Sequence, residues 1–259
     1  MRRTVGFCIA ILLFASAAPV WAADLKVKTS DITFKSGDEE IKGFLAEPEG
    51  KGPFPAIVVI QEWWGLTDWI KDNAKRLAAQ GYVTLAPDLY RGKVADKPEV
   101  ASQLSRGLPR DRAVRDLRAA VDTLAAKGNV NKERLGSIGW CMGGGYSLQL
   151  ALNDKRVKAC AMCYGRPVTE ADMLKPLNAT ILGIFGEEDR GIPPAMVEKF
   201  EAALKSAGKK TEAIKEFKAG HGFMRPGEGA MKNPAYREGP AKEAWQDIDR
   251  FFAKTLKGK

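Results

Sequence analysis

The sequence predicts an α/β fold in which helices cover both faces of a mostly parallel β-sheet. Apolar runs bounded by turn signals, without the alternation of half-exposed strands, occur at residues 56–60, 83–87, 135–139, 157–164 and 180–185. Between them lie segments whose apolar residues recur at helical spacing. Strands that alternate with helices indicate a sheet wrapped on both sides, and 259 residues fit one domain with one large core.

The first residues differ from the rest of the chain. Arg2 and Arg3 precede an apolar segment at residues 7–18, and Ala22 is the small residue that export peptidases require. We therefore expect residues 1–22 to be a signal peptide cleaved near Ala22, and residues 23–259 to form one exported, periplasmic domain. The alternative is an uncleaved anchor, but the apolar segment is shorter than the roughly 20 residues that span a bilayer. We expect no stable membrane span after processing.

Charge favours small anions as partners. Residues 1–22 contain two arginines and no acids, so their removal lowers the formal charge from +9 to +7. A positive field attracts nucleic acid, anionic surfaces and anionic substrates alike. No block of basic and aromatic residues resembles a nucleic-acid module, so we expect a small-molecule partner and no nucleic acid. The sequence does not predict an oligomeric state.

The fold is expected to begin with an antiparallel hairpin. Residues 32–34 and 41–46 have strand character and flank a polar turn. After the next strand, Thr67 or Asp68 can cap a helix that runs to Gly81. Glycine there suits the left-handed residue that closes many helices.

Three more helices are expected after this one and outside the central motif. Residues 113–124 have helical spacing and precede Gly128, which we expect to close that helix in the same left-handed way. The pair Pro193-Pro194 opens a helix that ends at Gly208. The final helix covers residues 241–256 and carries aromatic residues on one face.

Three cysteines remain after cleavage: Cys141, Cys160 and Cys163. In a compartment that favours disulfides, an odd number leaves at least one thiol free or paired with another chain. Cys160 and Cys163 have the spacing of a redox pair, yet they lie in a run that is typical of a buried strand, where positions three apart face opposite sides. A core role is favoured, and a redox pair is the open alternative.

The segment around Cys141 carries the strongest functional signal. A buried strand runs into Gly139-Trp140-Cys141-Met142-Gly143 and then into an apolar helix. Strand, glycine-flanked nucleophile and helix is the arrangement of a nucleophile elbow, in which bulky neighbours would collide with the adjoining strand and helix. The alternative is a buried cysteine in a glycine-rich turn.

A base and an acid follow in the order that this fold uses. His221 is the only histidine, and it lies in a glycine-flanked loop after the strand-like residues 213–217. The acid candidates follow the run at 180–185, and Asp189 is preferred over its neighbours Glu188 and Glu187 because it directly precedes the turn into the next helix. Ligand spacing for zinc and the motif of a nucleotide phosphate loop are both absent from the sequence, so we expect no metal and no cofactor.

With these residues in place, the chain resembles the dienelactone hydrolase family of the α/β-hydrolase superfamily. The resemblance runs from about residue 41 to the C-terminus and rests on four ordered motifs: residues 57–65, residues 86–92, the Cys141 elbow and residues 219–223. It implies a single-domain α/β-hydrolase fold and hydrolysis of a small ester or lactone through a Cys-His-Asp triad of Cys141, His221 and Asp189, with a thioacyl intermediate.

The resemblance also implies roles that no periodicity shows. Glu62 is expected beside the thiol, where it helps to generate the thiolate when substrate binds, so that the resting thiol resists oxidation. The backbone amides of Trp63 and Met142 are expected to form the oxyanion hole. Arg225 and, with a shift of one position, Arg91 match arginines that hold a substrate carboxylate.

Three departures from the family pattern bear on which substrate is expected. The shifted Arg91, the bulky pair at Trp63 and the export signal put dienelactone itself in doubt. The alternative function is a non-catalytic protein of the cell envelope that uses this fold to bind small anions.

Overall fold

The computed structural model describes residues 25–227 and 233–258. The expected signal peptide and its cleavage site lie outside the described residues. Within the described ranges, none of the helices is both long enough and apolar enough to cross a membrane.

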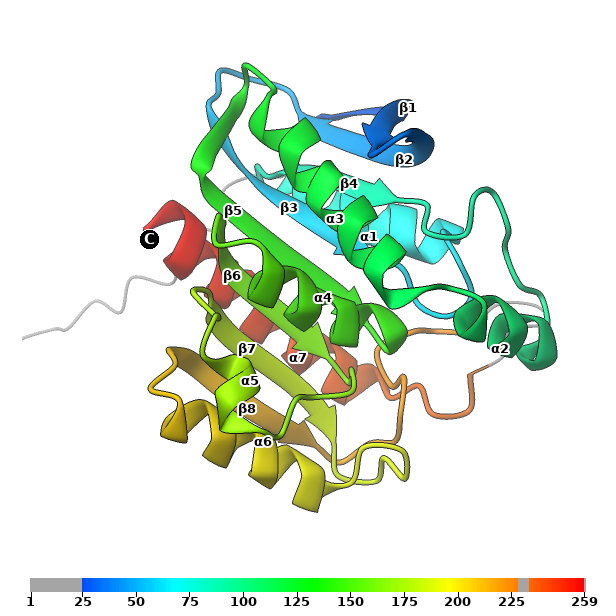
Figure 1. Ribbon diagram of the computed structural model, residues 1–259, viewed down its shortest axis with the longest axis vertical. Coiled ribbons are helices and arrows are strands. Elements are labelled where there is room, and N and C mark those ends of the chain that lie inside the picture. Colours follow the sequence, from blue (N-terminus) through cyan, green and yellow to red (C-terminus); the bar gives the residue numbers. More distant parts are fainter. Residues whose placement is uncertain (1–24, 228–232, 259) are drawn as a thin grey trace, which may run out of the picture.

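One sheet of eight strands runs through the molecule, in the order β1-β2-β4-β3-β5-β6-β7-β8 (Figure 1). Strands β3 to β8 are parallel, and β2 pairs antiparallel with both β1 and β4. The strands are β1 (Val27–Ser36), β2 (Glu39–Pro48), β3 (Phe54–Ile60), β4 (Val83–Pro87), β5 (Val130–Trp140), β6 (Val157–Cys163), β7 (Thr180–Gly186) and β8 (Thr211–Phe217).

Helices cover both faces of this sheet, as the alternating pattern predicts. They are α1 (Asp68–Ala79), α2 (Pro98–Arg106), α3 (Arg110–Ala125), α4 (Met142–Asn153), α5 (Ala171–Leu174), α6 (Pro194–Ser206) and α7 (Glu238–Phe252), with a π-helical turn at Ala253–Lys257. Helices α3, α4 and α6 contribute to the apolar cluster on one face, and α1 and α7 to the cluster on the other (Figure 1).

The expected fold class is confirmed, including the N-terminal hairpin. Of the glycines expected to end helices in the left-handed conformation, one is wrong. Gly81 and Gly208 have positive φ after α1 and α6. Gly128 does not, because α3 already ends at Ala125 and the turn that follows needs no left-handed residue. The last helix begins earlier than expected, at Glu238, and the short helices α2 and α5 were not expected.

The two buried cysteines belong to opposite faces of the sheet, as the strand interpretation predicts. Cys160 lies in the cluster with α4, and Cys163 lies in the cluster with α7. Both are free thiols in the structure. Burial raises the pKa of Cys160 to about 11, which suppresses its thiolate and supports the core role over the redox alternative.

The carboxyl ends of the parallel strands meet at one edge of the sheet, and the predicted site residues follow them. Glu62 comes two residues after β3, and Cys141 directly follows β5. Asp189 follows β7, and His221 follows β8. In open α/β sheets this edge is where ligands bind, so the topology gathers residues that are up to 159 positions apart in the chain.

Candidate active site

Cys141 sits on a strained turn between β5 and α4. Its φ is 54° and its ψ is -118°, a conformation that few residues other than glycine adopt. The Cys141 amide donates to the Cys163 carbonyl oxygen at 3.0 Å, and the Cys141 carbonyl accepts from the Gly144 amide at 3.1 Å. These bonds fix the turn from both sides, and the strand, the strained turn and the helix follow one another as predicted for this segment.

The glycines on either side permit a close backbone approach. A Cβ at Gly139 would collide with the backbone of Gly143, and a Cβ at Gly143 would collide with the carbonyl oxygens of Ile60 and Gln61. The end of β3 thus lies against the first turn of α4. This contact brings Glu62 and Trp63, the residues that follow Gln61, next to the elbow.

The structure joins His221 to Asp189. Nδ1 of His221 lies 2.6 Å from Oδ2 of Asp189, whose side chain is only 1% exposed, and Asp189 Oδ1 accepts from the amides of Gly191 and Ile192 at 2.8 and 3.1 Å. Both oxygens of the Asp189 carboxylate are thus held by named partners. The rival acid Glu188 is exposed and has no such contact with His221.

Charge in this cluster favours a protonated imidazole. Burial lowers the pKa of His221, but the hydrogen bonds to Asp189 and Cys141, together with electrostatic interaction with these two groups, outweigh it and raise the pKa to about 10. Burial likewise raises the pKa of Asp189, but the bond to His221 and the two amides outweigh it, so the carboxyl stays ionised. His221 therefore contacts Asp189 on one side and Cys141 on the other.

Glu62 is buried against Arg225. Its Oε2 lies 3.1 Å from Nε of Arg225, which is close enough for an ion pair, but this oxygen accepts no hydrogen bond in the described part of the chain. Burial raises the pKa of Glu62 to about 7, and the charges of Arg225 and His221 oppose the rise. The guanidinium of Arg225 also lies 5.4 Å from the Trp64 ring. Glu62 is thus a carboxyl group that changes its charge near neutral pH.

Two backbone amides at the elbow have no acceptor. Within residues 25–227 and 233–258, the amide of Met142, the first residue of α4, donates to no protein group, and neither does the amide of Trp63. Unpaired amides at a helix N-terminus carry a partial positive charge. They are suited to bind an oxygen that becomes negative.

Tyr164 is a residue of the site that the sequence interpretation missed. The apolar run at residues 157–164 predicts that Tyr164 ends a strand. In the structure β6 ends at Cys163, and Tyr164 has a φ of 36°. Its ring contacts His221 edge-on at 5.3 Å, and its buried hydroxyl has no hydrogen-bond partner in the described part of the chain. The signal that could have indicated it is its place directly after a buried parallel strand.

Arg91 is not brought to the thiol. It donates to Asp116 at 2.7 Å and to Glu39 at 2.6 Å, so it links the β1-β2 hairpin to α3. Its neighbour Tyr90 does reach the elbow, because the Tyr90 hydroxyl lies 3.3 Å from Sδ of Met142. The motif at residues 86–92 therefore supports the site through Tyr90 rather than through Arg91.

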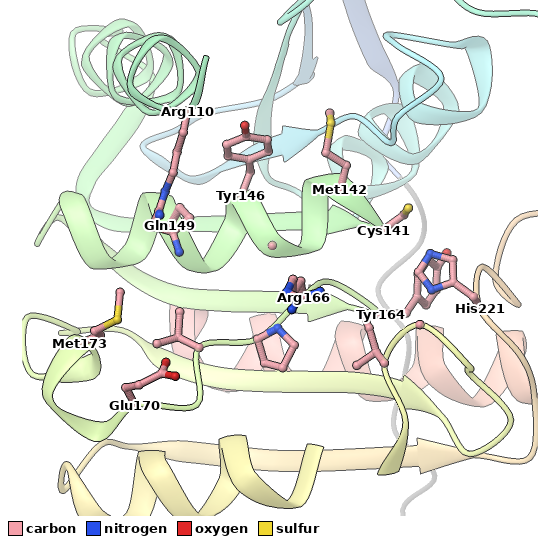
Figure 2. A pocket seen from close by; sticks show the side chains of 15 residues that line it. Arg110, Cys141, Met142, Tyr146, Gln149, Tyr164, Arg166, Glu170, Met173 and His221 are labelled. Carbon is pink, nitrogen blue, oxygen red and sulfur yellow. The ribbon is translucent and has the colours of Figure 1, made fainter. Parts of the chain in front are cut away.

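A cavity of about 570 Å³ opens at the reactive groups. Cys141 and His221 lie at one end of it, and the first two turns of α4 form one wall (Figure 2). No cluster of three or more histidine, cysteine or acidic side chains in the described ranges is arranged to hold a metal ion. The arrangement brings the Cys141 thiol, the His221 imidazole and Met142 to one cavity, with the Asp189 carboxylate next to the imidazole, and such groups are suited to acyl transfer.

Comparison with known proteins agrees with this arrangement. The sequence pattern of the dienelactone hydrolase family matches residues 41–256. A protein of Methylorubrum extorquens that carries the name carboxymethylenebutenolidase is 32% identical, over 97% of this chain and 92% of its own length. A protein of Escherichia coli K12 with the same name is 31% identical, over 92% of this chain and 94% of its own.

Solved structures show the same fold. A Klebsiella pneumoniae protein described as a dienelactone hydrolase superposes with a TM-score of 0.79 at 30% identity, covering 88% of this chain and 99% of its own. An acylaminoacyl peptidase of Pyrococcus horikoshii superposes with a TM-score of 0.69 at 19% identity, covering 90% of this chain and 42% of its own, which is a likeness of fold alone. The sheet and its helices are those of the α/β-hydrolase fold.

Proposed function

Because this chain belongs to the dienelactone hydrolase family, we propose that it hydrolyses an ester or lactone bond of a small, anionic molecule, with Cys141 as the nucleophile. The observation that carries the proposal is the pairing of His221 with Asp189 at the end of the cavity that Cys141 and His221 both line. A nucleophile, a base and a group that orients the base are the three parts of such a site.

Proton transfer begins with Glu62 in this proposal. With a pKa of about 7, Glu62 is partly ionised at neutral pH and can accept the proton of the Cys141 thiol. His221, with a pKa of about 10, is already protonated and cannot accept it. The thiolate that forms is held by the positive charge of His221 and by the N-terminus of α4.

Acylation follows from the thiolate. Sγ of Cys141 attacks the carbonyl carbon, and the carbonyl electrons move to oxygen, where the amides of Trp63 and Met142 stabilise the charge. The intermediate collapses to a thioester, and the departing alkoxide takes the proton of His221. Asp189 keeps the imidazole oriented with Nδ1 toward it throughout.

Hydrolysis of the thioester restores the site. Neutral His221 takes a proton from water, the hydroxide attacks the thioester carbon, and the carboxylic acid leaves as the C–S bond breaks. The Cys141 thiolate then takes back the proton from Glu62. Water is consumed, an acid and an alcohol are released, and each side chain returns to its first protonation state.

We also propose that this chain is exported, and a thiol that stays protonated until substrate binds fits an oxidising compartment. A thiolate is the form of cysteine that oxidises, and an oxidising compartment makes a permanent thiolate a hazard. Formation of the thiolate only when substrate enters would limit that damage. The signal peptide at residues 1–22 is the sequence feature that supports export.

A screen of lactones and short p-nitrophenyl esters tests the proposed function. We expect the wild type to turn over members of the panel, Cys141→Ala to lose turnover while it stays folded, and Cys160→Ala, the matched loss of a buried thiol, to keep it. Iodoacetamide should label Cys141, and a turned-over lactone should protect it. Retained turnover in Cys141→Ala, or no turnover with a thiol that resists labelling, would contradict the proposal, and the latter would favour the non-catalytic binding protein.

A further inference from the structure

The cavity extends well beyond the reactive thiol. From Cys141 and His221 it follows α4 to Gln149 and then reaches Arg110 at the start of α3 and Met173 in α5 (Figure 2). A small lactone ring would occupy only the part near the thiol. The remaining space can hold a second portion of a longer substrate.

Much of the cavity lining is apolar. It includes the side chains of Met142, Tyr146, Val168 and Ile192. Such walls favour a hydrocarbon chain or ring, since apolar surface is stabilised by removal from water. The substrate portion beside the thiol is therefore expected to be apolar.

Two arginines line the cavity, Arg166 midway along it and Arg110 at the end away from the thiol (Figure 2). Arg166 follows β6, and Arg110 begins α3, where it donates to the amide oxygen of Gln149 at 2.5 Å. In the described part of the chain neither arginine forms an ion pair, whereas Arg91 is paired with two carboxylates and Arg156 likewise.

One acidic side chain, Glu170, also lines this end. It is exposed, and its carboxylate accepts from the Thr169 hydroxyl at 3.1 Å. Two cations against one anion leave the part of the cavity away from the thiol positive. Arginine binds carboxylates through paired N–H donors, so this part of the cavity has the chemistry to recognise one.

We propose that Arg110 and Arg166 bind an anionic end group of the substrate, separated by an apolar spacer from the ester that Cys141 attacks. The substrate class is an ester with a remote carboxylate, such as a half-ester of a dicarboxylic acid. This inference rests on the proposed function, and it assigns substrate binding to a pair of arginines different from Arg91 and Arg225. The cavity determines which esters are preferred, and the elbow determines the chemistry.

Matched substrates test this specificity. Mono-4-nitrophenyl esters of dicarboxylic acids from succinate to suberate are compared with the same compounds capped as methyl esters, so that only the charge differs. Acetate esters of ω-hydroxycarboxylates and their methyl esters probe a carboxylate on the alcohol side. We expect kcat/KM to be higher for the charged member at an intermediate spacer length in one of the two series, and the advantage to shrink as NaCl is raised.

Variants locate the effect. An exposed ion pair changes kcat/KM by about two- to fivefold, so Arg110→Gln and Arg166→Gln should each lower the charged-to-capped ratio by that factor. Glu170→Gln should raise the ratio. Arg134→Gln, which removes an exposed arginine near the opposite end of β5, is the matched control and should not change it.

The outcomes separate this inference from the proposed function. If capped and charged esters are hydrolysed equally, or if the ratio is the same in Arg110→Gln, Arg166→Gln and Arg134→Gln, the arginine site is overturned while hydrolysis stands. If Cys141→Ala hydrolyses the capped ester as the wild type does, the proposed function itself has failed.

Discussion

Nδ1 of His221 lies 2.6 Å from Oδ2 of Asp189, although 32 residues separate the two in the chain. The contact forms because β7 and β8 are adjacent parallel strands and both residues follow the carboxyl ends of their strands. Two further amides hold the carboxylate in place. The pair gives the site an imidazole with a defined orientation and a raised pKa.

The titration of His221 can be followed directly. As the only histidine in the chain, it gives one imidazole signal in an untagged protein. NMR titration should give a midpoint well above 6.5, near the pKa of about 10, and Asp189→Asn should move it down because the main favourable contact is lost. The same substitution should lower kcat by on the order of a thousandfold or more. A wild-type midpoint near 6.5 would contradict this account.

Glu62 makes stability depend on pH in a stated direction. Its pKa rises from 4.5 in the unfolded chain to about 7 in the folded protein, so its contribution is fully present below pH 4.5 and is lost as the pH rises through 7. Urea unfolding should show wild type losing up to about 3 kcal/mol relative to Glu62→Gln between pH 4.5 and pH 8. Parallel curves for the two proteins would mean that the carboxyl does not carry the raised pKa.

The elbow glycines differ in how much space they have. Gly143→Ala should lower the unfolding free energy and reduce turnover, because its methyl group would push α4 and the Met142 amide away from β3. Gly145→Ala is the matched control in the same helix, since its Cβ would lie 3.5 Å from the nearest atom. Alanine there should be neutral or stabilising by up to about 1 kcal/mol. Equal behaviour of the two variants in unfolding and in turnover would count against the close approach.

Arg91 is expected to act on stability rather than on substrate binding. It pairs with Asp116, whose side chain is fully buried, so Arg91→Met removes the nearest cation from a buried carboxylate. Loss of one partner of a buried pair costs up to about 3 kcal/mol, and the cost is reduced here because Asp116 keeps the Ser36 hydroxyl and Arg115 and because Arg91 is about a quarter exposed. Chemical unfolding and the KM of an anionic ester measure the two effects. A raised KM at unchanged stability would support the substrate-binding role instead.

The parts of the fold that follow from local pattern were predictable. The apolar runs that became β4 and β7 and the left-handed closures at Gly81 and Gly208 depend on neighbouring residues alone. Gly128 shows the limit of that reasoning, because a glycine after a helix closes it only if the helix reaches it.

The site was predictable where chain order and motif carry it, and not where contacts between distant segments decide. Cys141 and Asp189 follow buried strands and His221 follows the more exposed edge strand β8, in the chain order that the motifs predict, so sequence could indicate them. Arg91 resembled a substrate arginine in its motif, but its partners lie 25 and 52 residues away, and no local pattern shows them. The positive charge that Arg110 and Arg166 give to the cavity likewise depends on how α3 packs near the loop after β6.

Trapping the acyl-enzyme is the most direct test of Cys141 as the nucleophile. A slowly hydrolysed 4-nitrophenyl ester is mixed with wild type, the reaction is quenched in acid within the first turnover, and peptides are analysed by mass spectrometry. The account predicts the mass of the acyl group on the peptide that contains Cys141, with loss of that adduct in Cys141→Ala. An adduct on another residue, or full turnover by Cys141→Ala, would contradict it.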